Sequence, residues 1–221
     1  MFLGHFGVAL AAKRAAPKTS LGTLVLAAQF ADLLWPIFLL LGWERVRIAP
    51  GITRVTPLDF VSYPWSHSLA AQVAWGAALG AVYFALRRDG PASVVIAACV
   101  PSHWLLDYIV HRPDMPLVPG GPRYGLGLWN SLPLTLAVEL AIYGTGLLIY
   151  LKERRAADRT GKFALWSLVV FLVAVYLVST FGPPPPNMHV LAYTALGIWL
   201  LVPWAGWADG HHMPRGNKTV T

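Results

Sequence analysis

Cysteine is nearly absent from this sequence of 221 residues, and charged side chains are scarce. The single cysteine, Cys99, excludes an intrachain disulfide and a cysteine-rich zinc site. Asp, Glu, Lys and Arg together make up 12% of the chain, whereas 56% is apolar. Because soluble domains carry about 25% charged residues, this composition predicts a chain that lies in a bilayer. Because the chain has only one cysteine, any bound metal must use His, Asp or Glu as ligands.

Two classes of binding protein are also disfavoured by what is missing. The formal net charge is +7, but no basic stripe is interleaved with aromatic residues outside the apolar runs, so nucleic acid is excluded as a partner. No glycine-rich phosphate loop is present, since Gly120-Gly121 lies between prolines as a turn. The sequence leaves the oligomeric state open.

Long apolar runs dominate the chain. A membrane-spanning helix needs about 20 residues, so seven spans leave no room for a separate soluble catalytic domain. We predict an all-α, polytopic integral membrane helix bundle of about seven segments, of which the first is short and either spans or lies in the interface. The expected segments are residues 2–16, 20–42, 67–87, 91–110, 129–151, 163–181 and 189–208. Residues 1–151 are expected to form the core with the metal site, and residues 152–221 two accessory helices and a tail.

The basic residues are distributed unequally between the loops. With seven spans, 12 of the 17 Lys and Arg residues fall on the side of the C-terminus and 5 on the other side. The positive-inside rule then predicts an N-terminus outside and a C-terminus in the cytoplasm, in the bacterial inner membrane.

The most informative polar pattern is His103, Asp107 and His111, which recur every four residues on one helix face. Ionisable groups inside a bilayer are costly and need a compensating role. An imidazole and a carboxylate one helical turn apart can ligate one cation, or can form a hydrogen-bonded pair that joins two helices. Cys99, one turn earlier, is expected to be a buried apolar thiol.

Three more candidate ligands are expected at the same depth, in the outer half of the bundle: His5, Asp32 and His67. Imidazole with carboxylate favours zinc, with manganese or iron as alternatives, and one or two ions. Glu139 is left as a partner of a metal ligand, a general base, or an inter-helix hydrogen-bonding residue. His211 and His212 are expected to be solvated.

An ordered set of short motifs resembles the bacterial membrane-bound metal-dependent hydrolases, which distantly resemble zinc-dependent phospholipase C. The motifs are Gly4-His5, Ala31-Asp32, Ser66-His67-Ser68 and Ser102-His103 with Asp107, all within residues 1–115. The resemblance implies that His5, Asp32, His67, His103 and Asp107 are metal ligands. A later His-x-x-x-Glu motif of the soluble relatives has no counterpart here.

The sequence thus favours a membrane-embedded, metal-dependent hydrolase of a phosphoester in a lipid or lipid-linked substrate. Asp107, His103 and Glu139 would be catalytic, and Arg112, Asp114 and Arg123 would bind substrate. The alternative is a proton- or metal-ion-coupled transporter or permease, in which the same Asp and His residues carry the ion. A third possibility is a non-catalytic assembly protein with a structural metal.

Overall fold

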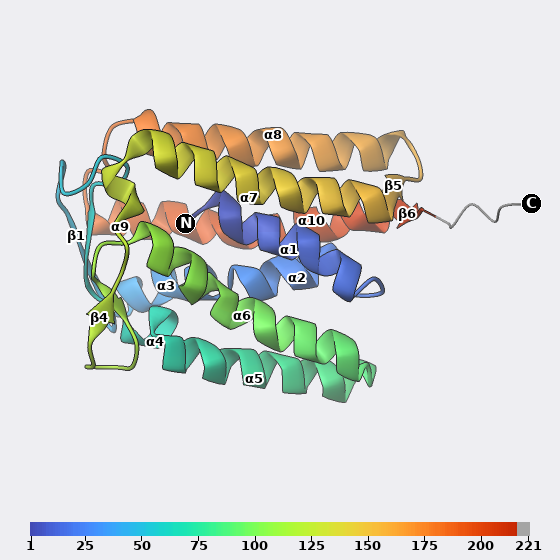
Figure 1. The fold of residues 1–221 in the computed structure, drawn as a ribbon, viewed down its shortest axis with the longest axis horizontal. Coiled ribbons are helices and arrows are strands. Elements are labelled where there is room, and N and C mark those ends of the chain that lie inside the picture. The colour runs from blue at the N-terminus through green and yellow to red at the C-terminus, as the bar shows by residue number, and fades with distance from the viewer. Residues whose placement is uncertain (216–221) are drawn as a thin grey trace, which may run out of the picture.

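The computed structural model describes residues 1–215 as a bundle of helices whose axes run along the long dimension of the molecule (Figure 1). The prediction of an all-α polytopic membrane bundle is confirmed. The α-helices are α1 (Leu3–Ala15), α2 (Leu21–Ala28), α3 (Phe30–Leu40), α4 (Pro64–His67), α5 (Leu69–Arg87), α6 (Gly90–Val110), α7 (Leu132–Glu153), α8 (Arg159–Phe181), α9 (Met188–Ala195) and α10 (Leu201–Gly210). Two 3-10 helices, η1 (Leu128–Asn130) and η2 (Leu196–Leu200), precede α7 and α10.

Five of the helical stretches are long and apolar enough to cross a membrane, and a sixth is added if α2 and α3 form one span. The predicted segment 20–42 is not one straight helix, because α2 and α3 meet at Gln29 with a bend of 56°. The first segment, α1, has 13 residues, which is about 20 Å of helix and shorter than the hydrocarbon core.

Capping side chains fix where several of these helices begin. Ser68, Asp89, Asp158 and Asn187 each accept a hydrogen bond from the backbone N–H three residues later, at the starts of α5, α6, α8 and α9. Such caps satisfy N–H groups that have no partner within the helix. The helix starts are therefore encoded locally.

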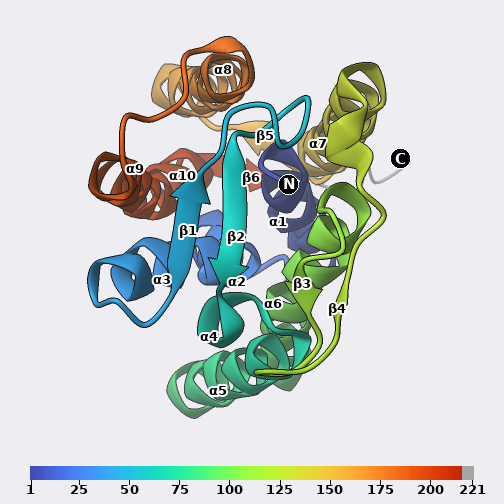
Figure 2. The same cartoon turned by 90° about the vertical axis from the view of Figure 1, so that its left-hand side faces the viewer.

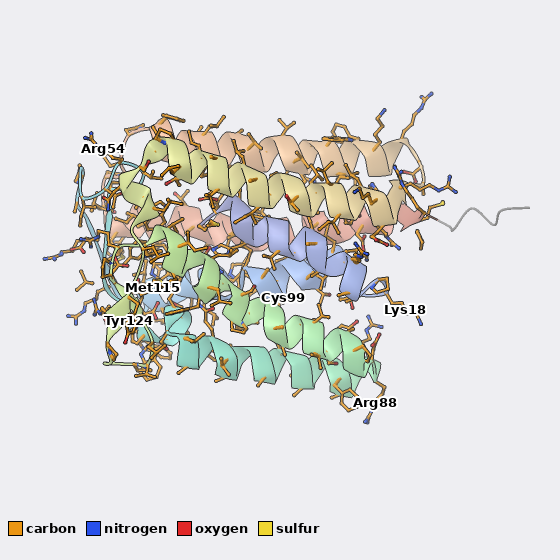
Figure 3. The ribbon with its side chains drawn as sticks, in the orientation of Figure 1. Lys18, Arg54, Arg88, Cys99, Met115 and Tyr124 are labelled. Carbon is orange, nitrogen blue, oxygen red and sulfur yellow. The ribbon has the colours of Figure 1, made fainter. Side chains whose placement is uncertain are left out.

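Short strands, which the sequence did not predict, tie the loops together at the two ends of the bundle. They form three antiparallel pairs: β1 (Arg45–Ile48) with β2 (Leu58–Ser62), β3 (Met115–Pro116) with β4 (Arg123–Tyr124), and β5 (Arg154–Ala156) with β6 (His212–Pro214). The first two pairs lie at one end, called here the loop end. The third pair lies at the opposite end, called here the basic end, together with Lys18 and Arg88 (Figure 3).

The short helix α1 occupies the middle of the bundle. Viewed along the bundle, α6 and α7 lie on one side of α1 and α10 on the other (Figure 2). It packs against α2, α6 and α7. The C-terminal helices pack directly on this N-terminal part, because α10 contacts α2 and Asp209 in α10 is paired with Lys13 in α1.

The outward faces of the long helices are apolar. Leu86, Val178 and Leu200 are 76%, 70% and 71% exposed, respectively. In α5, only 17% of the apolar 18-residue stretch is buried inside the molecule. Large apolar side chains on the outside are suited to contact with lipid chains rather than water.

Gly7 in α1 and Gly146 in α7 lie where the two helices cross. Because glycine has no side chain, the two helix backbones approach closely there. A Cβ atom at Gly146 would lie 2.6 Å from the carbonyl carbon of Gly7. Gly146→Ala is therefore expected to lower the free energy of unfolding by about 1–3 kcal/mol, measured by thermal unfolding in detergent. The control is Gly144→Ala on the same helix, where a Cβ would meet no atom within 4 Å and stability should be unchanged or slightly higher. Equal effects of both variants would contradict this packing.

Candidate cation-binding site

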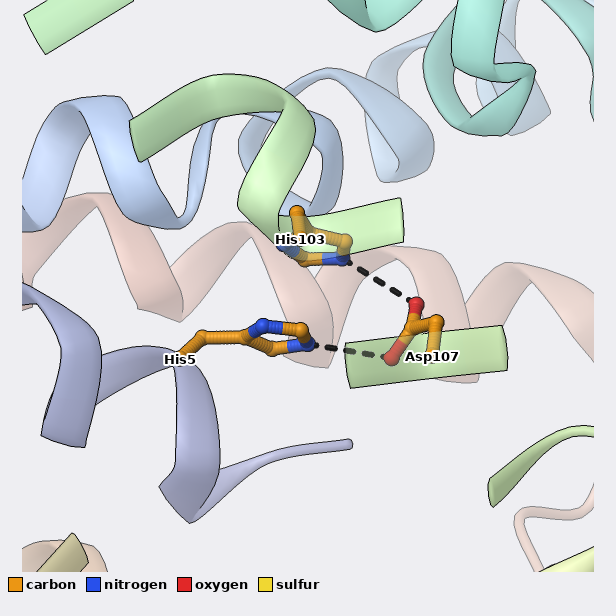
Figure 4. Close-up of side chains that lie close together, drawn as sticks. All are labelled: His5, His103 and Asp107. Atoms are coloured by element: carbon orange, nitrogen blue, oxygen red, sulfur yellow. Dashed lines mark hydrogen bonds and ion pairs between the residues drawn. The ribbon is translucent and has the colours of Figure 1, made fainter. Parts of the chain in front are cut away.

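Asp107 and His103 form the centre of the site, one turn apart on α6. The Nε2 atom of His103 lies 3.2 Å from Oδ2 of Asp107 (Figure 4). Both side chains are almost completely buried, at 0% and 3% exposed. His103 and Asp107 thus share one face of α6 that points into the bundle, whereas His111, the third residue of the predicted pattern, follows the end of the helix.

The short helix α1 brings His5 to the same carboxylate. Its Nε2 lies 3.1 Å from Oδ1 of Asp107, and its ring stacks on that of His103 with centroids 3.5 Å apart (Figure 4). The backbone amine of Met1 also contacts Oδ1 of Asp107. Asp107 therefore receives groups from both α1 and α6.

Asp32 and His67 complete the cluster from the other side. Asp32 lies in the first turn of α3, directly after the helix bend, and His67 is the last residue of α4. Oδ1 of Asp32 is 3.4 Å from Nε2 of His67 and 3.7 Å from Nε2 of His103. Asp32 is the most accessible member of the cluster, with a side chain that is 26% exposed.

The predicted ligand His111 lies at the edge of this cluster, immediately after α6. Its Nε2 is 3.8 Å from Oδ2 of Asp107, and its Nδ1 is 2.9 Å from Oδ1 of Asp114. Burial lowers the pKa of His111 below its usual range, which favours a neutral ring. His111 thus connects the cluster to the loop end.

The hydrogen bonds made by the Nδ1 atoms of His103 and His67 determine which ring nitrogen carries the lone pair. Nδ1 of His103 donates to the carbonyl oxygen of Ala28 at 2.9 Å, the carbonyl that lies next to the helix bend. Nδ1 of His67 lies 2.6 Å from Oγ of Ser66, whose hydroxyl donates to Oε2 of Glu44 at 2.6 Å. With Nδ1 acting as the donor, Nε2 in each neutral ring carries a lone pair.

In the neutral form of both rings, these Nε2 lone pairs face carboxylate oxygens of Asp32 and Asp107, so that acceptors face acceptors inside the bundle. Nε2 of His103 and Nδ1 of His5 are buried with no hydrogen-bond partner among the described residues. Two sets of ligand atoms come close enough to share one ion: His5, His103 and Asp107, and Asp32, His67 and His103. Adjacent ligands of a tetrahedral zinc ion lie about 3.3 Å apart, which fits the spacings in this cluster.

Of the roles that the sequence leaves open for Glu139, the structure shows inter-helix hydrogen bonding. Its Oε2 accepts hydrogen bonds from the backbone N–H groups of Phe2, Leu3 and Gly4, at 3.0, 2.7 and 3.3 Å. A carboxylate at this position neutralises the positive end of the α1 dipole and satisfies its free donors. Glu139 therefore fixes the start of α1 and, through it, the position of His5.

The predicted substrate-binding residues Arg112, Asp114 and Arg123 line one cavity of about 480 Å³ at the loop end. Arg47 and Asp59 line it too. Arg112 donates to Oδ1 of Asp59 at 2.9 Å, and Arg47 to Oδ2 of the same residue at 2.6 Å. The hydrogen bond from Arg47 holds the pKa of the Asp59 carboxyl below its usual range.

The sequence did not predict the burial of several polar residues. Glu44 is 1% exposed and hydrogen-bonds to Ser66, yet it stands in a loop where only the fold reveals its burial. At the basic end, Asp209 is paired with Lys13 and accepts from the hydroxyl of Tyr150 at 2.9 Å. His212 is buried, contrary to the expectation of a solvated pair, because Nδ1 donates to the carbonyl of Ala208 at 2.7 Å.

The fold is that of a polytopic helical membrane protein, and the cluster is a set of mostly buried His and Asp side chains whose atoms lie close enough to share a cation. The chain is similar to two curated proteins, both called sodium/bile acid cotransporter 4. The mouse protein is 32% identical over 95 residues, which is 40% of this chain and 22% of the relative. The human protein is 28% identical over 134 residues, which is 58% of this chain and 28% of the relative. The chain thus spans about a quarter of the length of these relatives, and no protein-family model and no solved structure matches it.

These comparisons overturn the resemblance to metal-dependent hydrolases, and with it the hydrolase function, because the relatives are transporters and no hydrolase family matches. The motifs that carried the resemblance are short, and the structure shows only that their His and Asp side chains lie close together. Buried Asp and His residues serve transporters as well as hydrolases, so the motifs do not separate the two classes. The transporter alternative agrees better with the comparisons.

The role of Glu139 can be tested by its effect on stability. Glu139→Ala leaves buried N–H groups of α1 without an acceptor and is expected to cost about 2 kcal/mol or more. Thermal unfolding in detergent should show a drop of about 5 °C, with a smaller drop for Glu139→Gln, which keeps one acceptor oxygen. Glu153→Ala on the same helix is the control, since that side chain is 42% exposed and its one ion pair within residues 1–215 is a 3.7 Å contact to Arg14. A silent Glu139→Ala variant would show that α1 is held by other contacts.

Proposed function

We propose that this protein is a membrane transporter, in which the cluster of His5, Asp32, His67, His103 and Asp107 binds a divalent transition-metal ion as the transported or coupling cation. The similarity to sodium/bile acid cotransporters supports the transporter class. The ligand set supports the choice of cation. Because the chain covers only about a quarter of the length of those relatives, its substrate is proposed from its own residues.

The observation that carries this proposal is the convergence of buried acceptors. Imidazole lone pairs of His67 and His103 point at the carboxylates of Asp32 and Asp107, at 3.2 to 3.9 Å. The Met1 amine contacts Oδ1 of Asp107, but with neutral imidazoles no other cation among residues 1–215 contacts Oδ2 of Asp107 or the carboxylate of Asp32. These acceptors would repel one another in a low-dielectric interior. A bound cation removes this penalty.

The nature of the ligands favours zinc, with manganese or iron as alternatives. Imidazole suits borderline transition metals, whereas hard cations prefer oxygen ligands. The relatives are named for sodium, but three of the five ligands here are histidines. Since both ligand sets include His103, one ion per cluster is the simplest occupancy.

The bent helix pair adds support for transport. Discontinuous helices near the middle of the membrane form the binding sites of many transporters, because the break frees backbone groups and permits movement. Here the break between α2 and α3 lies three residues before Asp32, and the carbonyl of Ala28 beside it accepts from His103. A movement of α3 relative to α6 would open or close the cluster by separating Asp32 from His103.

The arginine-lined cavity at the loop end is proposed to admit an organic anion. Arg47, Arg112 and Arg123 outnumber the carboxylates of Asp59 and Asp114, and guanidinium groups bind carboxylates or phosphates through paired hydrogen bonds. Asp114 links this cavity to the cluster through His111. An amphipathic anion, such as a lipid-like acid, is the substrate class that this arrangement fits.

The orientation follows from charge. The basic end carries Lys18, Arg88 and, in β5, Arg155, and the positive-inside rule supports a cytoplasmic basic end and an external loop end. We propose the bacterial inner membrane as the location. The cation cluster and the arginine-lined cavity would then both face the outer leaflet.

Transport can be measured in proteoliposomes that contain a fluorescent zinc indicator, with and without added cholate. The wild type is expected to show saturable zinc entry, or cholate uptake driven by a zinc gradient. Asp107→Asn and His103→Ala should reduce the flux at least tenfold and remove most of the zinc that the purified protein binds.

His189→Ala is the control, because this histidine is exposed on α9 and belongs to neither set of ligand atoms. Zinc that stays bound without flux of either solute would instead indicate a structural metal in an assembly protein. Unchanged zinc binding in both cluster variants would contradict the site itself.

The proposed orientation has a separate test. Reporter fusions after Arg155 should be active in the cytoplasm, and fusions after Gly120 should be active outside. Arg155 lies in β5 and Gly120 in the turn between β3 and β4, at opposite ends of the bundle, so neither fusion point interrupts a helix. The reverse pattern would place the cation cluster toward the cytoplasmic leaflet.

A further inference from the structure

A groove at the basic end of the bundle is independent of the cation cluster. It is a cavity of about 580 Å³ between α2 and α5, and it opens on the outside of the molecule. Both helices pack against α6, and Ile96 of α6 lies in the floor of the groove. Thr19, just before α2, and Tyr83 in α5 join the two sides of the groove by a hydrogen bond of 2.9 Å between their hydroxyls.

The lining changes character along its length. Toward the middle of the bundle it is apolar, with Leu26, Leu79 and Val82, and Val82 is 56% exposed. Toward the end of the bundle it is polar and basic, with Lys18 and Arg87. A molecule that fills the whole groove must therefore be apolar at one end and anionic at the other.

The charge at the polar end is not neutralised by the protein. Lys18 and Arg87 are exposed and form no salt bridge within residues 1–215. The one carboxylate in the lining, Asp89, caps α6 by accepting from the N–H of Ala92 at 3.1 Å. Two cations against one carboxylate leave the groove with a net positive charge.

We propose that this groove binds one anionic phospholipid from the leaflet at the basic end, with the phosphate between Lys18 and Arg87 and an acyl chain along Leu79 and Val82. Basic pockets between transmembrane helices on the cytoplasmic side are suited to anionic head groups. The apolar wall faces the bilayer, so the acyl chain enters from the side without leaving the membrane. The lipid joins α2 to α5, which have little direct contact.

The test compares lipids and matched charge variants on the full-length protein, stripped of lipid in detergent. Phosphatidylglycerol should raise the midpoint of thermal unfolding and remain bound as one molecule in native mass spectrometry. Phosphatidylcholine and inorganic phosphate should do neither, because the first lacks net charge and the second lacks the acyl chain. Lys18→Gln/Arg87→Gln is expected to weaken phosphatidylglycerol binding at least tenfold.

Arg155→Gln/Lys162→Gln removes the same charge from exposed positions at the same end, outside the groove, and should bind as the wild type does. Val82→Trp fills the apolar half and should also prevent binding. The proposal is overturned if both double variants lose affinity equally, if phosphatidylcholine binds as tightly, or if Val82→Trp leaves the bound lipid in place. Because none of these residues touches the cation cluster, the outcome does not depend on the transport assay.

Discussion

The structure depends on placing the buried carboxylate of Asp107 between the helices of an apolar bundle. Its side chain is 3% exposed, and it lies within 4 Å of His5, His67, His103 and His111. A charge at this depth is costly unless it is paired, so each neighbouring element must deliver a partner. The short helix α1, the bent pair α2 and α3, and the short helix α4 are all held in the positions that this requires.

The charged residues at the two ends of the bundle have different surroundings. At the loop end, arginines and aspartates pair around a solvent-reaching cavity, and His111 connects that cavity to the buried carboxylate. At the basic end, Lys13 and Asp209 are buried as a pair that joins α1 to α10. The first arrangement leaves groups accessible for a ligand, whereas the second holds helices together.

The error about function has a specific cause. Short motifs such as Ser66-His67-Ser68 predict the kind of atom that is offered to a cation, and the structure does bring these atoms together. They do not predict whether the ion activates water or moves with a substrate. The bend of 56° between α2 and α3, beside Asp32, was hidden in a continuous apolar run, and it is the feature that fits movement best.

The sequence by itself determined the helical segments and the spacing of His103 and Asp107, because hydropathy and the helical repeat are local properties. It also indicated that His5, Asp32 and His67 share a depth. Only the tertiary structure decided that Glu139 holds α1 and that Glu44, through Ser66, orients His67. These partners are separated by up to 137 residues, and their contacts depend on how the helices pack, which no local pattern encodes.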